Sequence, residues 1–290
     1  MTDLPDLSSP REVMALLEKH GLKPRKQLGQ NFLIDGNIAR KIVAAVGVKE
    51  GDAVVEIGPG VGALTAELAQ SGANLLAIEV DRGLAAMLED LFKPCPGVRV
   101  FRQDVLKVNW SELVGRYFEP AAAVKLVSNL PYVISGPFMY TLFRARFPFE
   151  TAVLMFQKEV AHRLVARPGD SNYGGLSVLS QYYTAGKVLF NVSNNVFWPR
   201  PRVGSAVLRL IPRRFILDEG EEELFWYLVQ GVFQQRRKTM FNNMLRIFPE
   251  LRLQMDEIFE EASIKPSIRP EQLTVEQFAM MTRITYNYHG

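Results

Sequence analysis

The stretch VVEIGPGVGALT, from Val54 to Thr65, joins an apolar run to a glycine-rich turn and then to a segment that favours a helix. Gly58, Gly60 and Gly62 allow a sharp turn and let a ligand approach bare backbone at a helix N-terminus, where amide donors are free. The stretch therefore predicts a strand–turn–helix unit that binds a cofactor. Because Gly58, Gly60 and Ala63 also satisfy the pattern G-x-G-x-x-[GA], a nicotinamide-dependent enzyme is an alternative.

Short apolar runs alternate with amphipathic segments on both sides of this unit. The predicted strands are Ala53–Ile57, Leu75–Val80, Val98–Phe101, Val124–Val127, Thr151–Phe156, Val188–Val192 and Ala206–Ile211. The predicted helices include Ala63–Gln70, Leu84–Phe92, Phe138–Phe147, Val160–Ala166 and Leu176–Ala185. This alternation indicates an α/β fold, a mainly parallel sheet covered by helices on both faces. The last two strands have no long helix between them, which predicts an antiparallel pair at one edge.

The composition and the hydrophobic pattern of the sequence change after Pro212. Acidic, amphipathic segments follow, and helices are expected over residues 221–244, 252–262 and 275–288. We therefore expect an α/β domain over residues 22–212 and a small helical domain over residues 213–290. Residues 1–21 are expected to form a tail with one short helix, Pro10–His20.

The composition indicates a soluble, cytoplasmic protein. Of the 290 residues, 48% are hydrophobic, which is enough for a sizeable core. We find no apolar run near the roughly 20 residues that a membrane-spanning helix needs, and the N-terminus carries acids where a secretory signal carries basic residues. The single cysteine, Cys95, and the scattered histidines do not have metal-ligand spacing, so no metal site is expected.

Positive charge is concentrated in one segment of the chain. Residues 151–212 contain 7 Lys and Arg but 2 Asp and Glu, whereas the net charge of the whole chain is only +3. A local excess of this kind favours a polyanionic partner such as RNA, although a solvated surface is the simpler explanation.

Two acidic residues follow the glycine turn at informative positions. Glu79 lies near the end of the next strand, 21 positions after Gly58. In a doubly wound sheet its carboxylate would lie beside the turn and accept hydrogen bonds from ribose hydroxyls. Asp104, after the third strand, is placed to accept a hydrogen bond from an adenine amino group. Together these residues predict an adenosine-containing cofactor.

The fourth strand runs into SNLPY, from Ser128 to Tyr132. Together with EIGPGVG, this sequence resembles the S-adenosylmethionine-dependent methyltransferases, among which Asn-Leu-Pro-Tyr is the catalytic motif of enzymes that methylate the exocyclic amine of adenine. The resemblance implies a class I, Rossmann-like fold with a seven-stranded, mainly parallel sheet, and S-adenosylmethionine as cofactor. A dehydrogenase would give no reason for this motif.

Each residue of NLPY suits the methylation of an adenine amine, whose lone pair is delocalised into the ring. The side-chain oxygen of Asn129 and a backbone carbonyl at Leu130 or Pro131 can accept hydrogen bonds from the two amine protons and aim the lone pair at the methyl donor. Pro131 fixes the backbone and donates no competing N–H. Tyr132 offers a flat face for stacking, worth about 1–3 kcal/mol per base. Catalysis then depends on position and electrostatics.

A second aromatic wall is expected, because a base must leave its stack to reach such a site. The stretch VFWPRPRVGSAV offers Phe197 as this wall, in a loop that its prolines stiffen. Arg200 and Arg202 can hold RNA phosphates beside it. A proline-rich connector that leads into the next strand is the alternative interpretation.

Further blocks narrow the resemblance to one family, the ribosomal RNA adenine dimethyltransferases. The blocks KQLGQNFLID, FQKEVAHRL, NYGGLSVLSQYY, VFWPRPRVGSAV and FQQRRKTMFNNM occur in order, and the resemblance extends from about Leu22 to Tyr286. It implies that two methyl groups are added to each of two adjacent adenosines in the 3′-terminal hairpin loop of 16S rRNA. The implied partner is the immature small ribosomal subunit, and we expect a monomer.

The resemblance also implies roles for individual residues. The implied cofactor contacts are Gln30, Asn31, Leu33, Gly58, Gly60, Glu79, Asp104 and Asn129. The implied base pocket is formed by Asn129, Leu130, Pro131, Tyr132 and Phe197. In the last block Arg236, Arg237 and Lys238 are expected within a helix, where they would bind rRNA phosphates; a solvated helix face is the simpler explanation.

Two alternatives for the function remain open in the sequence. The related large-subunit (23S) rRNA methyltransferases of the macrolide-resistance type usually read Asn-Ile-Pro-Tyr and lack the glycine of LGQNFL, so Leu130 and Gly29 favour a small-subunit substrate. The second alternative is an assembly factor that binds the immature small subunit as a checkpoint, with methylation as the release step.

Overall fold

The computed structural model describes residues 4–119, 122–213 and 217–289. The chain forms two compact units, one of Met1–Ala161 with Gly186–Pro212 and one of His162–Ala185 with Arg213–Gly290. The first unit contains the sheet and the second is helical. The expected boundary at residue 212 left residues 162–185 with the sheet, whereas the structure groups them with the C-terminal helices.

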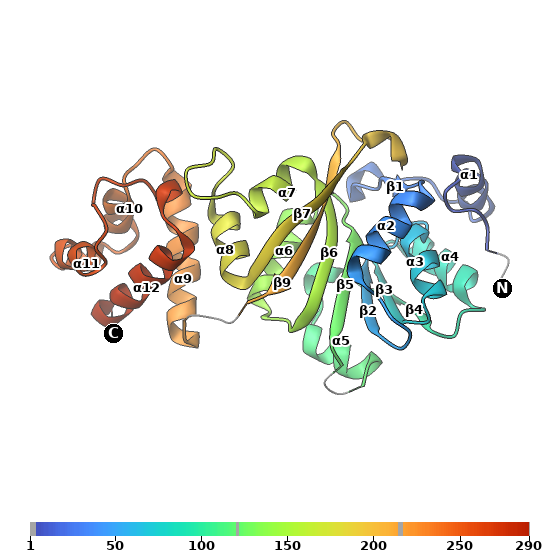
Figure 1. Ribbon diagram of the computed structural model, residues 1–290, viewed down its shortest axis with the longest axis horizontal. Coiled ribbons are helices and arrows are strands. Elements are labelled where there is room, and N and C mark those ends of the chain that lie inside the picture. Colours follow the sequence, from blue (N-terminus) through green and yellow to red (C-terminus); the bar gives the residue numbers. More distant parts are fainter. Residues whose placement is uncertain (1–3, 120–121, 214–216, 290) are drawn as a thin grey trace. The chain divides into compact units, whose positions relative to one another are not determined.

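A seven-stranded sheet forms the core of the first unit, in the order β4-β3-β2-β5-β6-β9-β7 (Figure 1). The strands are β2 (Ala53–Ile57), β3 (Asn74–Glu79), β4 (Val98–Arg102), β5 (Val124–Asn129), β6 (Phe149–Gln157), β7 (Thr184–Val192) and β9 (Ser205–Pro212). The strands from β4 to β6 pair in parallel, and β9 is antiparallel to β6. The predicted class of fold is confirmed, and the reversed strand lies second from one edge.

Burial on both faces explains why the central strands read as continuous apolar runs. All five residues of β2 are buried. On one face Val54 packs in a core with Ile42 of α2 and Leu68 of α3. The helices of this unit are α1 (Pro10–Lys19), α2 (Gly36–Val46), α3 (Ala63–Gln70), α4 (Arg82–Phe92), α5 (Trp110–Tyr117), α6 (Ser135–Arg144) and α7 (Lys158–Leu164), whose last residues belong to the second unit. The structure thus adds α2 and α5 to the predicted helices.

A small second sheet joins two segments that are far apart in the sequence. Strand β1 (Phe32–Leu33) pairs antiparallel with β8 (Phe197–Trp198), with Leu33 opposite Phe197. Both strands are two residues long, too short to leave a periodic signal in the sequence. The pairing ties the QNFL motif to the loop that contains Phe197.

The second unit is built from helices, as the sequence predicts for the end of the chain. They are α8 (Gly175–Tyr183), α9 (Glu219–Val232), α10 (Met240–Ile247), α11 (Met255–Glu261) and α12 (Val275–His289). Tyr173 and Tyr182 explain why the segment before β7 joins this unit: Tyr173 Oη donates to the carbonyl of Leu273 at 2.8 Å, and the ring of Tyr182 lies 4.5 Å from that of Phe225. Across the described residues, we find no helix that is both long and apolar enough to cross a membrane.

The single helix predicted over residues 221–244 is wrong, because the chain breaks between α9 and α10. Thr239 caps α10 by accepting a hydrogen bond from the backbone of Asn242. The N–H of Met240 donates to the carbonyl of Ile268 at 2.6 Å. The sequence around Met240 does not predict this contact, because the two residues are far apart in the chain. Buried Asn243 donates its amide to carbonyls of the break, including that of Gln235 at 3.3 Å. Tertiary contacts therefore override the helical periodicity here.

Candidate cofactor and adenine site

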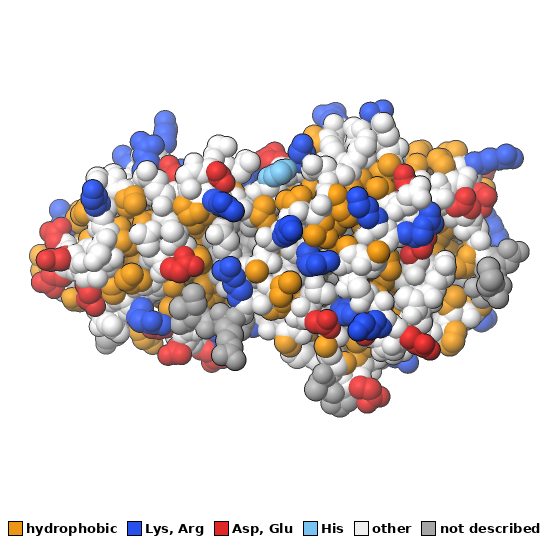
Figure 2. Space-filling model, viewed as in Figure 1, with side chains coloured by type: hydrophobic (Ala, Val, Ile, Leu, Met, Phe, Trp, Pro, Cys, Tyr) orange, Lys and Arg blue, Asp and Glu red, His pale blue; other side chains and the backbone are white. Residues whose placement is uncertain are grey.

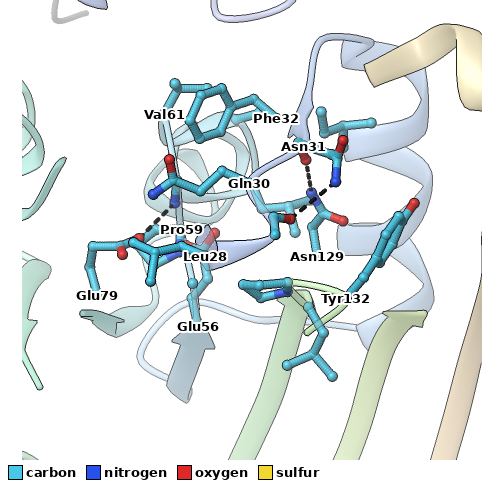
Figure 3. Close-up of a pocket in the computed structure, with 18 of the residues that line it drawn as sticks. Leu28, Gln30, Asn31, Phe32, Glu56, Pro59, Val61, Glu79, Asn129 and Tyr132 are labelled. Carbon is cyan, nitrogen blue, oxygen red and sulfur yellow. Dashed lines mark hydrogen bonds between the residues drawn. The ribbon is translucent and has the colours of Figure 1, made fainter. Parts of the chain in front are cut away.

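One pocket of the first unit brings together three of the motifs found in the sequence (Figure 3). It lies at the ends of β2, β3 and β5, where an α/β sheet usually binds its ligand. The residues that line it are Leu28 to Leu33, Glu56, Gly58 to Val61, Ala63, Leu64, Glu79, Val80 and Asn129 to Tyr132. The predicted cofactor residues, except Asp104, and the whole of NLPY therefore meet at one cavity.

The glycine turn needs its glycines for two separate reasons. Gly58 and Gly60 have φ of 63° and 61°, a conformation that other residues rarely adopt. A Cβ on Gly60 would also lie 2.9 Å from the ring of Phe32, and one on Gly58 would lie 3.1 Å from the ring of Pro131. The turn thus packs against both QNFL and NLPY and leaves bare backbone toward the pocket.

Glu79 closes the far side of the turn with a buried carboxylate. Its Oε2 accepts the N–H of Gly60 at 3.2 Å, and its Oε1 accepts the N–H of Asp81 at 2.9 Å. Burial raises the pKa of Glu79 to about 7, although the two backbone donors oppose the shift. A carboxylate held in this way can accept hydrogen bonds from a ribose, and ligand hydroxyls would favour its charged form.

Glu56 is a pocket residue that the sequence reasoning missed. It is 1% exposed, and Thr65 Oγ1 donates to its Oε2 at 2.7 Å. Burial raises the pKa of Glu56 to about 8, and the nearby charge of Glu79 adds to the rise. The signal was available in the sequence, because Glu56 is the single acid in the apolar run before the glycine turn. Burial therefore favours the protonated form of the Glu56 side chain.

The QNFL segment is fixed to the rest of the pocket by hydrogen bonds. Gln30 Oε1 accepts the backbone N–H of Arg25 at 2.7 Å, and Asn31 Nδ2 donates to the carbonyl of Gly29 at 3.0 Å. The guanidinium of Arg25 pairs with buried Asp81 at 3.1 Å. These contacts hold the predicted cofactor residues of the segment over the cavity.

Gly29 explains how QNFL and NLPY approach each other closely. Its φ is 64°, and a Cβ there would lie 2.9 Å from Cγ2 of Val133 and 3.4 Å from the backbone N of Tyr132. Any side chain at this position would push the two segments apart. Gly29, which the related large-subunit enzymes lack, therefore has a packing role in this chain.

Asn129 is the last residue of β5, and its amide has a defined direction. Its Nδ2 donates to the backbone carbonyl of Asn31 at 3.1 Å, as Figure 3 shows. With the amino group used in this way, the side-chain oxygen of Asn129 is left to accept a hydrogen bond from a ligand. The next residue, Leu130, is 1% exposed and donates its N–H to the carbonyl of Met155 in β6.

Pro131 and Tyr132 complete the turn after β5. The carbonyl of Pro131 accepts the N–H of Ile134 at 3.1 Å and the hydroxyl of Ser135 at 3.3 Å. The hydroxyl of Tyr132 lies 2.6 Å from that of Ser205, and burial raises the pKa of the Tyr132 phenol. The ring therefore has a fixed far end while its face remains partly exposed.

Two of the residues predicted for the cofactor and the base lie outside the pocket lining. Asp104 follows the end of β4, and its Oδ1 accepts the N–H of Leu106 at 3.1 Å. Phe197 is 2% exposed and belongs to the hydrophobic core beside Leu33. The structure thus gives Asp104 a capping contact and Phe197 a core position, next to the pocket rather than in it.

The predicted phosphate-binding residues are exposed, but they have different surroundings. In the first unit both Arg200 and Arg202 are exposed, and Arg200 donates to Asn194 Oδ1 at 3.1 Å. On the face drawn in Figure 2, basic side chains are spread among acidic and hydrophobic ones rather than gathered in one patch. No group of three or more His, Cys, Asp and Glu side chains among the described residues could hold a metal ion.

The basic residues of the second unit do not lie within a helix as predicted. Arg236 and Arg237 form a turn and Lys238 a bend in the break between α9 and α10. The guanidinium of Arg236 donates to the carbonyls of Ser171 and Tyr173 at 3.3 Å and 3.0 Å. Part of this basic cluster therefore stabilises its own unit.

Comparisons with known proteins identify the family of the chain. The ribosomal RNA adenine dimethylase family matches residues 21–285. The ribosomal RNA small subunit methyltransferase A of Pediococcus pentosaceus is 41% identical over 283 residues, which cover 96% of this chain and 95% of that protein. The protein of the same name from Ligilactobacillus salivarius is 44% identical over 280 residues, which cover 95% of each.

Two crystal structures also resemble the chain over most of its length. A dimethyladenosine transferase from Plasmodium falciparum has a TM-score of 0.68 at 25% identity, and the match covers 84% of this chain and 94% of the other. The 23S rRNA methyltransferase ErmE has a TM-score of 0.64 at 25% identity, with 88% and 99% covered.

Proposed function

The chain belongs to the ribosomal RNA adenine dimethylase family, and from this premise we propose that it dimethylates two adjacent adenosines in the 3′-terminal hairpin loop of 16S rRNA. The enzyme uses S-adenosylmethionine, and we assign its substrate to the immature small ribosomal subunit. The observation that carries the proposal is the orientation of Asn129, whose amino group is bound to Asn31 and whose oxygen remains for an amine. We expect it to act as a monomer in the cytoplasm.

The glycine-turn end of the pocket suits the cofactor. Gly58 and Gly60 line the pocket without side chains, and Glu79 can accept hydrogen bonds from a ribose. Gln30, Asn31 and Leu33 line the same cavity and would hold the rest of the molecule. When bound, S-adenosylmethionine supplies an electrophilic methyl group. Asp104 remains a candidate for the adenine contact, because its capping bond to Leu106 uses Oδ1 and the carboxylate has a second acceptor oxygen.

The opposite end suits the amine of the target adenine. The oxygen of Asn129 would accept a hydrogen bond from one of the two N–H groups of the amine. For the second proton we assign the carbonyl of Leu130, because the carbonyl of Pro131 already accepts two hydrogen bonds inside the turn. Two acceptors in fixed positions favour a pyramidal nitrogen with its lone pair available, without a strongly basic side chain. The nitrogen becomes acidic once it is methylated and can then lose its proton to solvent.

The base itself would stack on Tyr132. Phe197 stays a candidate for the opposite wall, and its burial means that the loop after β7 would have to move for its ring to reach a base. Arg200 and Arg202 lie in this loop and are exposed, so we propose them for phosphates near the extruded nucleotide. In the helical unit we propose Arg237 and Lys238, and also Arg236, although its guanidinium already binds two carbonyls.

Sequence identity favours small-subunit rRNA over large-subunit rRNA as the substrate. The small-subunit relatives are 41% and 44% identical to this chain, whereas the 23S rRNA methyltransferase ErmE is 25% identical. Leu130 and Gly29 favour the same assignment, and Gly29 has a physical reason in its contact with Val133. A checkpoint role in assembly is compatible with the same site. An enzyme that binds the immature subunit before it methylates the rRNA can hold that subunit until methylation releases it.

Transfer of a labelled methyl group to isolated ribosomal particles tests the proposal. Unmethylated small subunits should be labelled, whereas large subunits and naked RNA should not. Label confined to large subunits would contradict the substrate, and the absence of label on any RNA would contradict the activity. Replacement of the wild-type protein by Asn129→Ala in cells separates the checkpoint role: normal assembly with this variant, but not after deletion, would show that binding is the main role.

A further inference from the structure

The hydroxyl of Tyr132 makes a hydrogen bond to Ser205, a residue of the block VFWPRPRVGSAV to which no role has been assigned above. Its Oη lies 2.6 Å from Oγ of Ser205, a distance at which either group can donate. Ser205 is the first residue of β9 and pairs with Gln157 of β6, and it is fully buried at 0% exposure. The carbonyl of neighbouring Gly204 accepts the N–H of Lys158 at 3.0 Å. The Ser205 hydroxyl is therefore held in place by the sheet.

Tyr132, by contrast, stands on a turn after β5. Its backbone is confined by Gly29, but its side chain has two rotatable bonds that the turn does not fix. A hydrogen bond at the far end of the ring fixes the direction in which the ring points from the turn. Figure 3 shows the ring beside Asn129, on the side of the pocket away from Glu79. The direction of the ring axis thus depends on a partner 73 residues away in the sequence.

We propose that Ser205 is a positioning residue that fixes the direction of the Tyr132 ring and, through it, the position of the target adenine. The inference rests on the proposed function, in which the base stacks on this ring. A tilted ring would carry the base with it and move the amine away from the oxygen of Asn129. A misplacement of about 1 Å can cost roughly 10²-fold in rate, so a small tilt has a measurable effect.

The second methyl transfer should depend on this positioning more than the first. An unmodified amine has two protons and can donate to both Asn129 and Leu130. A monomethylated amine has one proton left, so only one hydrogen bond holds it, and stacking on Tyr132 carries a larger share of its orientation. Loss of the Ser205 bond should therefore slow the second transfer preferentially and release monomethyladenosine.

The test compares Ser205→Ala, Tyr132→Phe and the double variant on unmethylated small subunits. Each single variant removes the same bond and keeps the aromatic ring. We expect kcat to fall about tenfold in each, with KM for the subunit and the affinity for cofactor changed less than about threefold. The double variant should match the singles, since the bond can be lost only once. In all three, the share of monomethyladenosine in the product should rise.

Ser177→Ala is the matched control, because Ser177 is also buried and its hydroxyl donates to the carbonyl of Arg163 at 2.6 Å, in the helical unit. It should leave the ratio of monomethyl to dimethyl product unchanged. A wild-type ratio and kcat in Tyr132→Phe would overturn the inference, as would additive losses in the double variant. If Ser205→Ala does not fold, Tyr132→Phe alone decides. An inactive wild-type enzyme would instead contradict the proposed function.

Discussion

The two ends of the pocket differ in how they hold polar groups. At the glycine-turn end, Glu56 and Glu79 are buried carboxylates whose pKa values burial raises to about 8 and about 7. At the other end Asn129 and backbone carbonyls provide acceptors, and the residues of this turn that line the pocket, Asn129 to Tyr132, include no carboxylate. We therefore expect cofactor affinity to depend on pH and charge. The rate of methyl transfer to the amine should instead depend on the positions of the acceptor oxygens.

The largest expected effect is at the amine end. Asn129→Ala removes an acceptor that is aimed by its bond to Asn31, and we expect kcat to fall about 10²- to 10³-fold, as for other fixed polar groups that act on a reacting atom. The dissociation constant for cofactor should change by only a few fold. Single-turnover methyl transfer and calorimetric titration measure the two quantities.

Asn74→Ala is the matched control for this substitution. Asn74 begins β3 at the opposite end of the strands, where its Nδ2 donates to the carbonyl of Gly51 at 3.1 Å. Its loss should leave the rate of transfer unchanged. Equal losses of cofactor affinity and kcat in Asn129→Ala would remove the distinction between the two ends.

The next effect is at the cofactor end. Glu79→Ala removes the expected ribose acceptor and leaves the N–H groups of Gly60 and Asp81 without their partner. We expect cofactor binding to weaken about 10- to 100-fold, because hydrogen bonds to charged groups are worth about 1.5–3 kcal/mol. Binding to small subunits without cofactor should be unchanged, and exposed Glu89→Ala serves as control. A parallel loss of subunit binding would argue against the assigned role.

A third substitution breaks the contact between the two ends. Gly29→Ala places a Cβ 2.9 Å from Val133 Cγ2 at a φ of 64° and should displace QNFL from NLPY, lowering kcat at least about tenfold. Gly47→Ala is the control, because its φ is 68° but a Cβ there meets nothing within 4 Å. In both variants the free energy of unfolding, measured by thermal denaturation, should fall by about 1 kcal/mol. A similar kcat in both would show that strain rather than the contact matters.

The smallest effect expected is that of pH on cofactor binding. Ribose hydroxyls bind the charged form of Glu79, and a proton competes with them below its pKa of about 7. Affinity should therefore rise about tenfold from pH 6 to pH 8, with release of a proton on binding. Titrations at both pH values, and in buffers that differ in ionisation enthalpy, measure this. Glu79→Gln should remove most of the dependence, and a full dependence in that variant would assign it to another group.

The same comparison shows what the sequence could predict. The glycine-turn end is contiguous, and β2 and α3 have the bounds that their apolar patterns predict, Ala53–Ile57 and Ala63–Gln70. The amine end depends on contacts across long separations, 98 residues from Asn31 to Asn129 and 73 from Tyr132 to Ser205. No periodicity reveals such pairs, so the motif was predictable but the direction of its amide was not.

Contacts with distant residues also decide positions elsewhere in the chain. The helix predicted over residues 221–244 breaks because Met240 binds the carbonyl of Ile268 and Asn243 binds the carbonyls before α10. Phe197, predicted as a wall of the base pocket, is buried by its pairing with Leu33 in a two-residue strand. In each case a distant partner decides the position of a residue whose local sequence favours something else.

The most direct test of the account is the number and position of methyl groups that the enzyme adds to unmethylated small subunits. Mass spectrometry of the rRNA after complete reaction should find dimethyladenosine at two adjacent positions in the 3′-terminal hairpin loop, four methyl groups in all. Asn129→Ala with cofactor bound should add none in the same time. Methyl groups on large-subunit rRNA, on a single adenosine or on another atom of the base would contradict the account.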